Sequence, residues 1–304
     1  MLLPNFLIIG TPKAGTTSLY SYLNQHPDVF MPSVKEPGFL LLDGHTLTGT
    51  ATHAVEHPLT YAVTTVEHYQ SLFDAVTTET AIGEASGSYL SSKRAVDGIK
   101  KHIPHARLIA SLRNPIDRAY SHYQMWANLG RDSLTFAEAI DAEPLEPVAR
   151  DEWIPLERRH LRHGFYYQHL KRYLDHFPRE QMHIILFDDL NRDPAGVTKA
   201  TFRFLGIDDG FTPDTSIKLN KTGSPKNRLL HHLLHSRNPI RQTIKTLLPD
   251  RISSPLYHRI RNANLRPTPS QLTPEIRAHL IDIFREDILK LQDLIERDLS
   301  EWLC

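Results

Sequence analysis

The chain has 304 residues, of which 40% are hydrophobic and 23% charged, a composition typical of a globular protein with one or two domains. Its 35 basic and 35 acidic side chains give a formal net charge of zero, so no global field attracts nucleic acid. One cysteine, Cys304, excludes an internal disulfide framework and fits a reducing compartment. No apolar run approaches the roughly 20 residues that span a bilayer, and no basic leader precedes residue 6, so we expect a cytoplasmic protein without a transmembrane segment.

Near the N-terminus, FLIIGTPKAGTTSL predicts a strand, a tight turn and the start of a helix. Residues 6–9 are a continuous apolar run, which favours a parallel strand covered on both faces. Gly10 and Gly15 bound the turn, and residues 16–18 follow where a helix exposes unpaired N–H groups. A helix start with hydroxyl side chains and Lys13 nearby is suited to binding a phosphate or sulfate group.

The spacing from Gly10 to Gly15 matches only the first half of a nucleotide-triphosphate loop. Such a loop needs Lys and then Ser or Thr directly after the second glycine, whereas Thr16 and Thr17 follow here. The one lysine of the stretch, Lys13, lies inside the loop. These residues indicate an anion site of another kind, and an ordinary turn with a helix-capping threonine is the alternative.

Further predicted strands and helices alternate along the chain. They are strands at 81–84, 107–112 and 183–187, and helices at 17–25, 67–73, 165–176 and from Pro115, with Asn114 as N-cap. Residues 43–66 lack periodicity and are predicted as a loop, a candidate lid or acceptor-binding segment. Strands separated by helices imply crossover connections, and hence an α/β fold with a central, mainly parallel sheet flanked by helices.

The segment from residue 216 to 266 is strongly basic, with eleven basic residues and one acidic residue, Asp250. Apolar residues at helical spacing indicate that part of it packs as helix. Its basic face is solvated, pairs with acidic patches elsewhere, or meets an anionic acceptor or a membrane surface. After this segment, Thr273 and Pro274 begin an amphipathic helix that we interpret as a structural closure.

Three segments carry motifs in a fixed order. They are PKAGTTSLYSYLNQHPDVFMPSVKEPGFL from residue 12, LIASLRNPIDRAYSHY at 108–123 and LNKTGSPKNRLL at 219–230. They resemble the 5'-phosphosulfate loop, the 3'-phosphate-binding strand and helix, and the nucleotide-closing loop of sulfotransferases that use 3'-phosphoadenylyl sulfate (PAPS). The nearest subgroup is the heparan-sulfate-type carbohydrate sulfotransferases and their bacterial relatives. The resemblance runs over most of the chain and implies a P-loop-like three-layer fold.

The resemblance also implies roles for individual residues. Lys13 would contact the bridging oxygen of the donor and stabilise the leaving 5'-phosphate, with PAP as the product. Arg113 and Ser121 would hold the 3'-phosphate. A solvated Lys13 and an ion pair between Arg113 and Asp117 are the alternatives. The implied donor-binding residues are Lys13, Ala14, Gly15, Thr16, Thr17, Ser18, Arg113, Ser121, Lys221, Gly223, Lys226 and Arg228.

Glu36, in the sequence Lys-Glu-Pro, matches the general base of heparan-type enzymes. A carboxylate at this position would take the proton from an attacking hydroxyl or amine. The other candidate bases are Glu84, at a predicted strand end, and His122; a surface glutamate paired with a neighbouring lysine is the alternative for Glu36. The chain departs from heparan-type enzymes at Ala85 and Gly87, where those enzymes usually have Lys and Pro.

We therefore interpret residues 1–304 as one sulfotransferase domain. It would move the sulfuryl group of PAPS in line to a hydroxyl or amine of a carbohydrate or small-molecule acceptor. No bound metal is implied, since the neighbouring His231, His232 and His235 lack other ligands at metalloenzyme spacing. A nucleotide-binding module without catalysis and, behind it, a P-loop kinase are the alternatives. The acceptor and the oligomeric state stay open.

Overall fold

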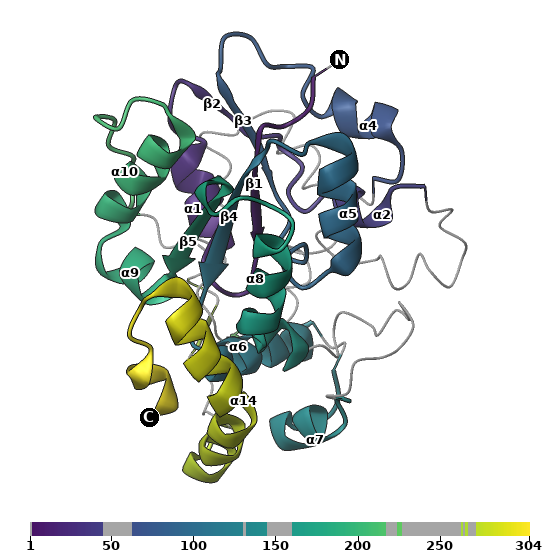
Figure 1. Cartoon of the computed structure of the whole chain (residues 1–304). Coiled ribbons are helices and arrows are strands. Elements are labelled where there is room, and N and C mark those ends of the chain that lie inside the picture. The colour runs from purple at the N-terminus through teal and green to yellow at the C-terminus, as the bar shows by residue number, and fades with distance from the viewer. Residues whose placement is uncertain are drawn as a thin grey trace.

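The computed structural model is built around one central sheet (Figure 1). The described residues are 2–44, 63–129, 132–144, 160–216, 224–226, 263, 265–266 and 272–304. In this part of the chain the sheet has five strands in the order β2-β3-β1-β4-β5, and every neighbouring pair is parallel. The predicted α/β fold with a mainly parallel sheet is confirmed.

The strands are short and lie close to their predicted positions. They are β1 (Phe6–Gly10), β2 (Val29–Phe30), β3 (Ala81–Ala85), β4 (Arg107–Leu112) and β5 (Met182–Leu186). The sequence does not predict β2, because two residues carry no periodicity. Leu7 pairs with Glu84 on one side and with Leu108 on the other. The carboxyl ends of β1, β3 and β4 therefore meet at one edge of the sheet, where ligands of open α/β folds bind.

Alternating residues of the central strand enter two different cores. Phe6 and Ile8 join a core with side chains of α1, α9 and α10, whereas Leu7 and Ile9 join a core with α5, α6, α8 and α14. This alternation follows from the two-residue period of a strand, and it explains why the run is apolar throughout. Figure 1 shows α1, α9 and α10 on one side of the sheet and α5 and α8 on the other.

The helix α6 begins with Asn114, the capping residue that the sequence indicates. The Asn114 side chain accepts hydrogen bonds from the N–H groups of Ile116 (3.0 Å) and Asp117 (3.4 Å) at the start of α6. The described α-helices are α1 (Thr16–Leu23), α2 (Phe39–Leu42), α4 (Val66–Ser71), α5 (Lys93–His102), α6 (Pro115–Asn128), α7 (Phe136–Asp141), α8 (Tyr166–Leu174), α9 (Phe187–Arg192), α10 (Pro194–Leu205) and α14 (Pro274–Ile295).

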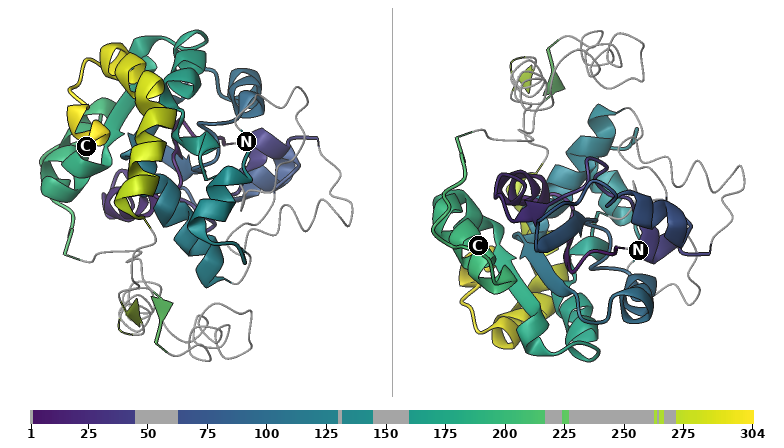
Figure 2. Two further views of the ribbon diagram at one scale, coloured as in Figure 1. Left: turned by 90° about the horizontal axis from the view of Figure 1, so that it is seen from below. Right: turned by 90° about the horizontal axis from the view of Figure 1, so that it is seen from above.

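The C-terminal helix α14 packs across α8 and α6 (Figure 2). Thr273 caps it by accepting a hydrogen bond from Ile276 N–H (3.4 Å), as predicted. Its apolar stripe is buried in the larger core. One polar residue of the helix, Asp287, is also buried, and its Oδ2 accepts a hydrogen bond from Tyr167 N–H at the start of α8 (3.0 Å). A carboxylate at a helix N-terminus satisfies N–H groups that have no partner within the helix.

Several predictions concern residues outside the described part of the chain. These are most of the loop at 43–66, most of the basic segment at 216–266, and the closing-loop residues Lys221, Gly223 and Arg228. Of the closing loop, Lys226 is described, and its Nζ donates to the Ala263 carbonyl oxygen (2.8 Å) beside the antiparallel pair β6 (Ser224–Pro225) and β7 (Leu265–Arg266). The single domain over 1–304 stays a prediction. None of the described helices has the length and apolarity needed to cross a membrane.

Candidate active site

The donor loop, residues 10–15, connects β1 to α1 through two residues in the left-handed region. Lys13 has φ 72° and Gly15 has φ 85°, and Gly15 is the N-cap of α1. Among the described residues no side chain caps this helix, so the alternative of a capping threonine is wrong. The uncapped N–H groups of the first turn fit an anionic group, since a helix N-terminus carries partial positive charge.

Hydrogen bonds join the donor loop to the neighbouring strand β4 and to the residue that follows it. Thr11 N–H donates to the Ser111 carbonyl oxygen (2.7 Å), and the Ser111 hydroxyl donates to the Ala14 carbonyl oxygen. Arg113, which follows β4, donates from Nη1 to the Lys13 carbonyl oxygen (3.2 Å). The loop and Arg113 are therefore joined directly, although a hundred residues separate them in the sequence.

The guanidinium of Arg113 is held between the donor loop and α9. It lies 4.7 Å from the centre of the Phe187 ring, a distance typical of a cation–π contact. Burial lowers the pKa of Arg113 from its usual value, and the nearby Asp117 opposes this shift. Asp117 itself forms an ion pair with Arg277 (2.6 Å), so the predicted alternative of a simple Arg113–Asp117 pair does not describe this site.

Ser121 lies on the buried side of α6, two helical turns after Arg113. Its hydroxyl is buried and makes no hydrogen bond to any described residue. A buried hydroxyl without a partner is costly, and polar atoms of this kind commonly have a partner that is not part of the protein. The predicted role of Ser121 in holding the 3'-phosphate together with Arg113 stays a prediction.

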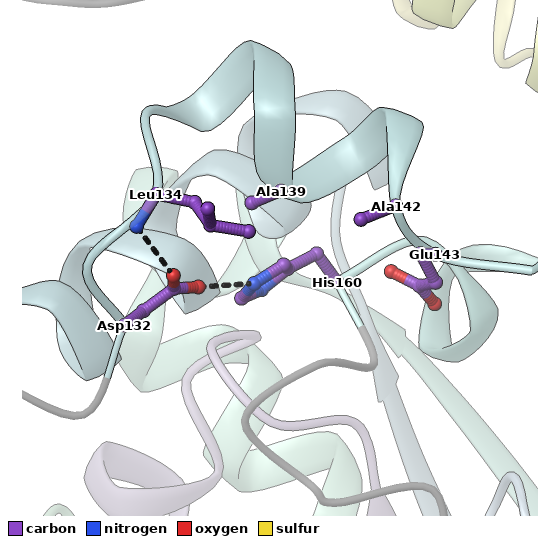
Figure 3. Close-up of a pocket in the computed structure, with 6 residues that line it drawn as sticks. All are labelled: Asp132, Leu134, Ala139, Ala142, Glu143 and His160. Carbon is purple, nitrogen blue, oxygen red and sulfur yellow. Dashed lines mark hydrogen bonds and ion pairs between the residues drawn. The ribbon is translucent and has the colours of Figure 1, made fainter.

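His122 is enclosed by a directed chain of hydrogen bonds. Trp126 Nε1–H donates to His122 Nε2 (3.1 Å), so the His122 proton lies on Nδ1 and is donated to His160 Nδ1 (3.0 Å). His160 Nε2–H then donates to Asp132 Oδ2 (3.2 Å), as Figure 3 shows. Burial and nearby positive charges hold the pKa of His122 well below its usual range. Both ring nitrogens are occupied in the core, and this environment disfavours His122 as a base.

The cavity drawn in Figure 3 belongs to this chain of hydrogen bonds. Its lining includes Asp132, Glu143 and His160, and its volume of about 10 Å³ is room for one water molecule. It is therefore too small for a nucleotide or an acceptor. Burial also lowers the pKa of His160 to about 4. His160 and His122 are therefore both uncharged near neutral pH.

Glu36 is fixed at the carboxyl end of β3. Its N–H donates to the Ala85 carbonyl oxygen (2.9 Å), and its Oε2 accepts from Gly87 N–H (2.7 Å). Its Oε1 pairs with Lys35, so the predicted alternative of a pair with a neighbouring lysine exists, but the carboxylate is also held by the turn after β3. The side chain keeps 23% of its surface exposed, which leaves it accessible to an acceptor.

The same turn brings Glu36 toward the donor loop. A Cβ atom on Gly87 would lie only 3.3 Å from the backbone nitrogen of Pro12, so the turn packs closely on the loop. Ala85, where heparan-type enzymes usually have Lys, is buried. The third candidate base, Glu84, is fully buried and has no access to an acceptor.

Some residues of this site are not predicted from the sequence. Phe187 and Ser111 hold Arg113 and the donor loop. A polar residue in the otherwise apolar strand LIASL is a signal that could have indicated Ser111. Phe187 could have been found from its position directly after a strand at the ligand-binding edge. In the described part of the chain no group of three or more His, Cys, Asp or Glu residues is arranged to hold a metal ion.

Comparisons with known proteins identify the family of the chain. The family model "Sulfotransferase domain" matches residues 3–229. The human bifunctional heparan sulfate N-deacetylase/N-sulfotransferase 3 is 31% identical over 210 residues, which are 67% of this chain and 22% of that protein. The bifunctional heparan sulfate N-deacetylase/N-sulfotransferase 1 of Caenorhabditis briggsae is 29% identical over 237 residues, which are 75% of this chain and 25% of that protein. The chain therefore matches at most a quarter of the length of these relatives.

A solved structure is similar over the whole chain. The crystal structure of a sulfotransferase from Alicyclobacillus acidocaldarius superposes with a TM-score of 0.71 at 31% identity, covering 99% of both chains. A sulfotransferase domain from the curacin biosynthetic pathway has a TM-score of 0.51 at 14% identity and shares the fold. The chain belongs to the sulfotransferase family, and it is a sulfotransferase enzyme with the P-loop-like fold.

Proposed function

We propose that this enzyme transfers the sulfuryl group of PAPS to a hydroxyl or amine of a carbohydrate or small-molecule acceptor. The observation that carries the proposal is the meeting of the donor loop, Arg113 and the Glu36 carboxylate at one edge of the sheet. A carbohydrate acceptor is favoured because relatives over this region are named as heparan sulfate N-sulfotransferases.

The donor-binding residues would act through charge and hydrogen bonding. The uncapped first turn of α1 (Thr16, Thr17 and Ser18) would bind the 5'-phosphosulfate through its N–H groups and hydroxyls. Arg113 and the unpartnered Ser121 hydroxyl would bind the 3'-phosphate. Bound PAPS supplies an activated sulfuryl group with PAP as its leaving group.

The transfer itself needs one base and one cation. Glu36 would accept the proton of the attacking hydroxyl or amine, because it is fixed by Gly87 N–H and still partly exposed. Lys13, in the middle of the donor loop, would stabilise the negative charge that develops on the leaving phosphate oxygen. In-line transfer would break the bond between the donor's sulfur and its phosphate oxygen as the acceptor's new bond to sulfur forms, and the acceptor proton would end on Glu36.

The experiment that tests the proposal combines donor binding and transfer. Calorimetric titration should show PAP binding roughly 10–100-fold tighter than AMP, because AMP lacks the 3'-phosphate and therefore the charge-assisted contacts to that group. ³⁵S-labelled PAPS should then label an acceptor drawn from pools of heparosan, desulfated heparan and small phenols. Equal affinity for PAP and AMP, with no labelled product from any pool, would refute it.

The two alternatives have different signatures. A nucleotide-binding module without catalysis would bind PAP but transfer nothing, and an ordered, accessible Glu36 argues against it. A kinase would bind ATP in preference to PAP, but Thr16 stands where its lysine would follow Gly15.

A further inference from the structure

Glu84 is an ionisable side chain that the proposed transfer does not use. It is 0% exposed at the end of β3, and both of its oxygens accept hydrogen bonds. The Tyr69 hydroxyl donates to Oε1 (3.3 Å) and the Ser86 hydroxyl donates to Oε2 (2.9 Å). Burial raises the pKa of Glu84 to about 7, and the nearby charge of Glu36 adds to the rise. A buried carboxyl that is this costly to maintain suggests a specific task.

The Ser86 hydroxyl connects Glu84 to the loop that carries Glu36. A serine hydroxyl has one proton, and here Glu84 accepts it. The Ser86 oxygen is then free to accept from Gly38 N–H (3.4 Å), two residues after Glu36. The result is a directed chain from the Gly38 N–H through Ser86 to the Glu84 carboxylate.

Hydrogen bonds therefore fix the loop both at Glu36 and after it. The Glu36 N–H and carboxylate are bound by Ala85 and Gly87, and the Gly38 N–H is bound by Ser86. Glu36 has φ 61°, a conformation that is unfavourable for residues other than glycine and persists only where the surroundings enforce it.

We propose that Glu84 is a positioning residue, which fixes the loop of residues 36–38 through the Ser86 hydroxyl and so aims Glu36 at the reacting centre. This inference rests on the proposed role of Glu36 as the base. Glu84 also binds Tyr69 of α4, and Val63 N–H, just before α4, donates to the Pro37 carbonyl oxygen (3.1 Å). One buried carboxyl therefore joins β3, α4 and the loop of the base.

The first test separates positioning from catalysis by kinetics. Ser86→Ala and Glu84→Met should each lower kcat roughly 10–100-fold, because a displaced base loses its near-attack geometry. The Kd for PAP should stay within about twofold, since no donor contact changes. Glu84→Gln should recover most of the kcat lost in Glu84→Met, because its amide oxygen can accept the Ser86 hydroxyl proton. The matched control is Thr198→Val, which removes a buried hydroxyl from α10.

Hydrogen exchange gives a readout that does not depend on the reaction. Ser86→Ala should increase amide exchange of the peptide covering residues 36–42 by roughly tenfold, while Thr198→Val leaves it unchanged. If Glu84→Met fails to fold, Ser86→Ala still provides both measurements, since it removes one oxygen atom.

Different results would contradict the positioning role of Glu84 and the proposed transfer reaction. Loss of kcat in Glu84→Gln as complete as in Glu84→Met would identify Glu84 as the base and overturn its positioning role. Unchanged exchange and kcat in Ser86→Ala would also overturn it. If the wild-type protein transfers no sulfuryl group, the proposed function fails, and the exchange measurement alone decides whether Glu84 fixes this loop.

Discussion

The Gly87 N–H donates a 2.7 Å hydrogen bond to Oε2 of Glu36, which ties the loop after β2 to the turn after β3. Because the same glycine packs against Pro12, the carboxylate and the donor loop lie close to one another at this end of the sheet. The acidic and the cationic parts of the proposed reaction thus depend on two neighbouring parallel strands, β3 and β1. This relationship makes the contributions of Glu36 and the donor-binding residues experimentally separable.

Glu36→Gln should abolish most turnover without weakening the donor complex. The amide keeps the size of the side chain but cannot take a proton, so kcat should fall by roughly 10²–10⁴-fold. Steady-state kinetics and calorimetry with PAP test this, with the surface variant Glu79→Gln as control. Full activity in Glu36→Gln would exclude it as the base.

Arg113→Ala should weaken PAP far more than AMP. Removing a charge-assisted contact of about 1.5–3 kcal/mol corresponds to roughly 10–100-fold in Kd for PAP, whereas AMP lacks the 3'-phosphate. Titration of both nucleotides against wild type and variant measures the difference. Arg277→Ala, which removes the ion pair of Asp117, is the control. A parallel loss for both nucleotides would mean that Arg113 only supports the loop through the Lys13 carbonyl.

Gly15→Ala should destabilise the protein more than Gly44→Ala. Both glycines have positive φ (85° and 73°), so alanine costs about 1–2 kcal/mol of backbone strain at either position. At Gly15 the new Cβ would also lie 2.9 Å from the Leu190 side chain, whereas at Gly44 no atom of the described residues lies within 4 Å. Overpacking should add about 1–3 kcal/mol to the loss at Gly15. Urea unfolding of the two variants provides the comparison, and equal losses would contradict the close packing of α9 on the donor loop.

Asp287→Asn should change how stability depends on pH. Burial raises the pKa of Asp287 from its ordinary 3.8 to about 6, so the folded state binds this proton more tightly than the unfolded chain does. The stabilisation is complete below the ordinary pKa and is lost as pH rises through about 6, a change of about 3 kcal/mol for two pKa units. In Asp287→Asn, the free energy of unfolding should fall less steeply as pH rises from about 4 to about 6 than it does in the wild type. Denaturant unfolding at a series of pH values in this range measures the difference. Asp282→Asn, at an exposed position of the same helix, should keep the wild-type slope, and an unchanged slope in Asp287→Asn would disprove the assignment.

Local sequence patterns are sufficient to predict most strands of the sheet and the first residues of two helices. Apolar runs of strand length predict β1, β3, β4 and β5, and Asn114 and Thr273 mark the beginnings of α6 and α14, because capping and strand burial depend on neighbours in sequence. The strand β2 is missed, since its two residues are defined only by their pairing with β3.

The sequence by itself determined the family motifs and three candidate bases, but only the tertiary structure distinguished the environments of those bases. His122 is enclosed by His160 and Trp126, Glu84 is buried against Tyr69 and Ser86, and Glu36 has a partly exposed carboxylate held by Gly87. Most of these partners are distant in sequence: 38 residues separate His122 from His160, and 51 separate Glu36 from Gly87. Solvent access and hydrogen bonding between such distant residues are set by the packing of strands and helices, which no local pattern encodes.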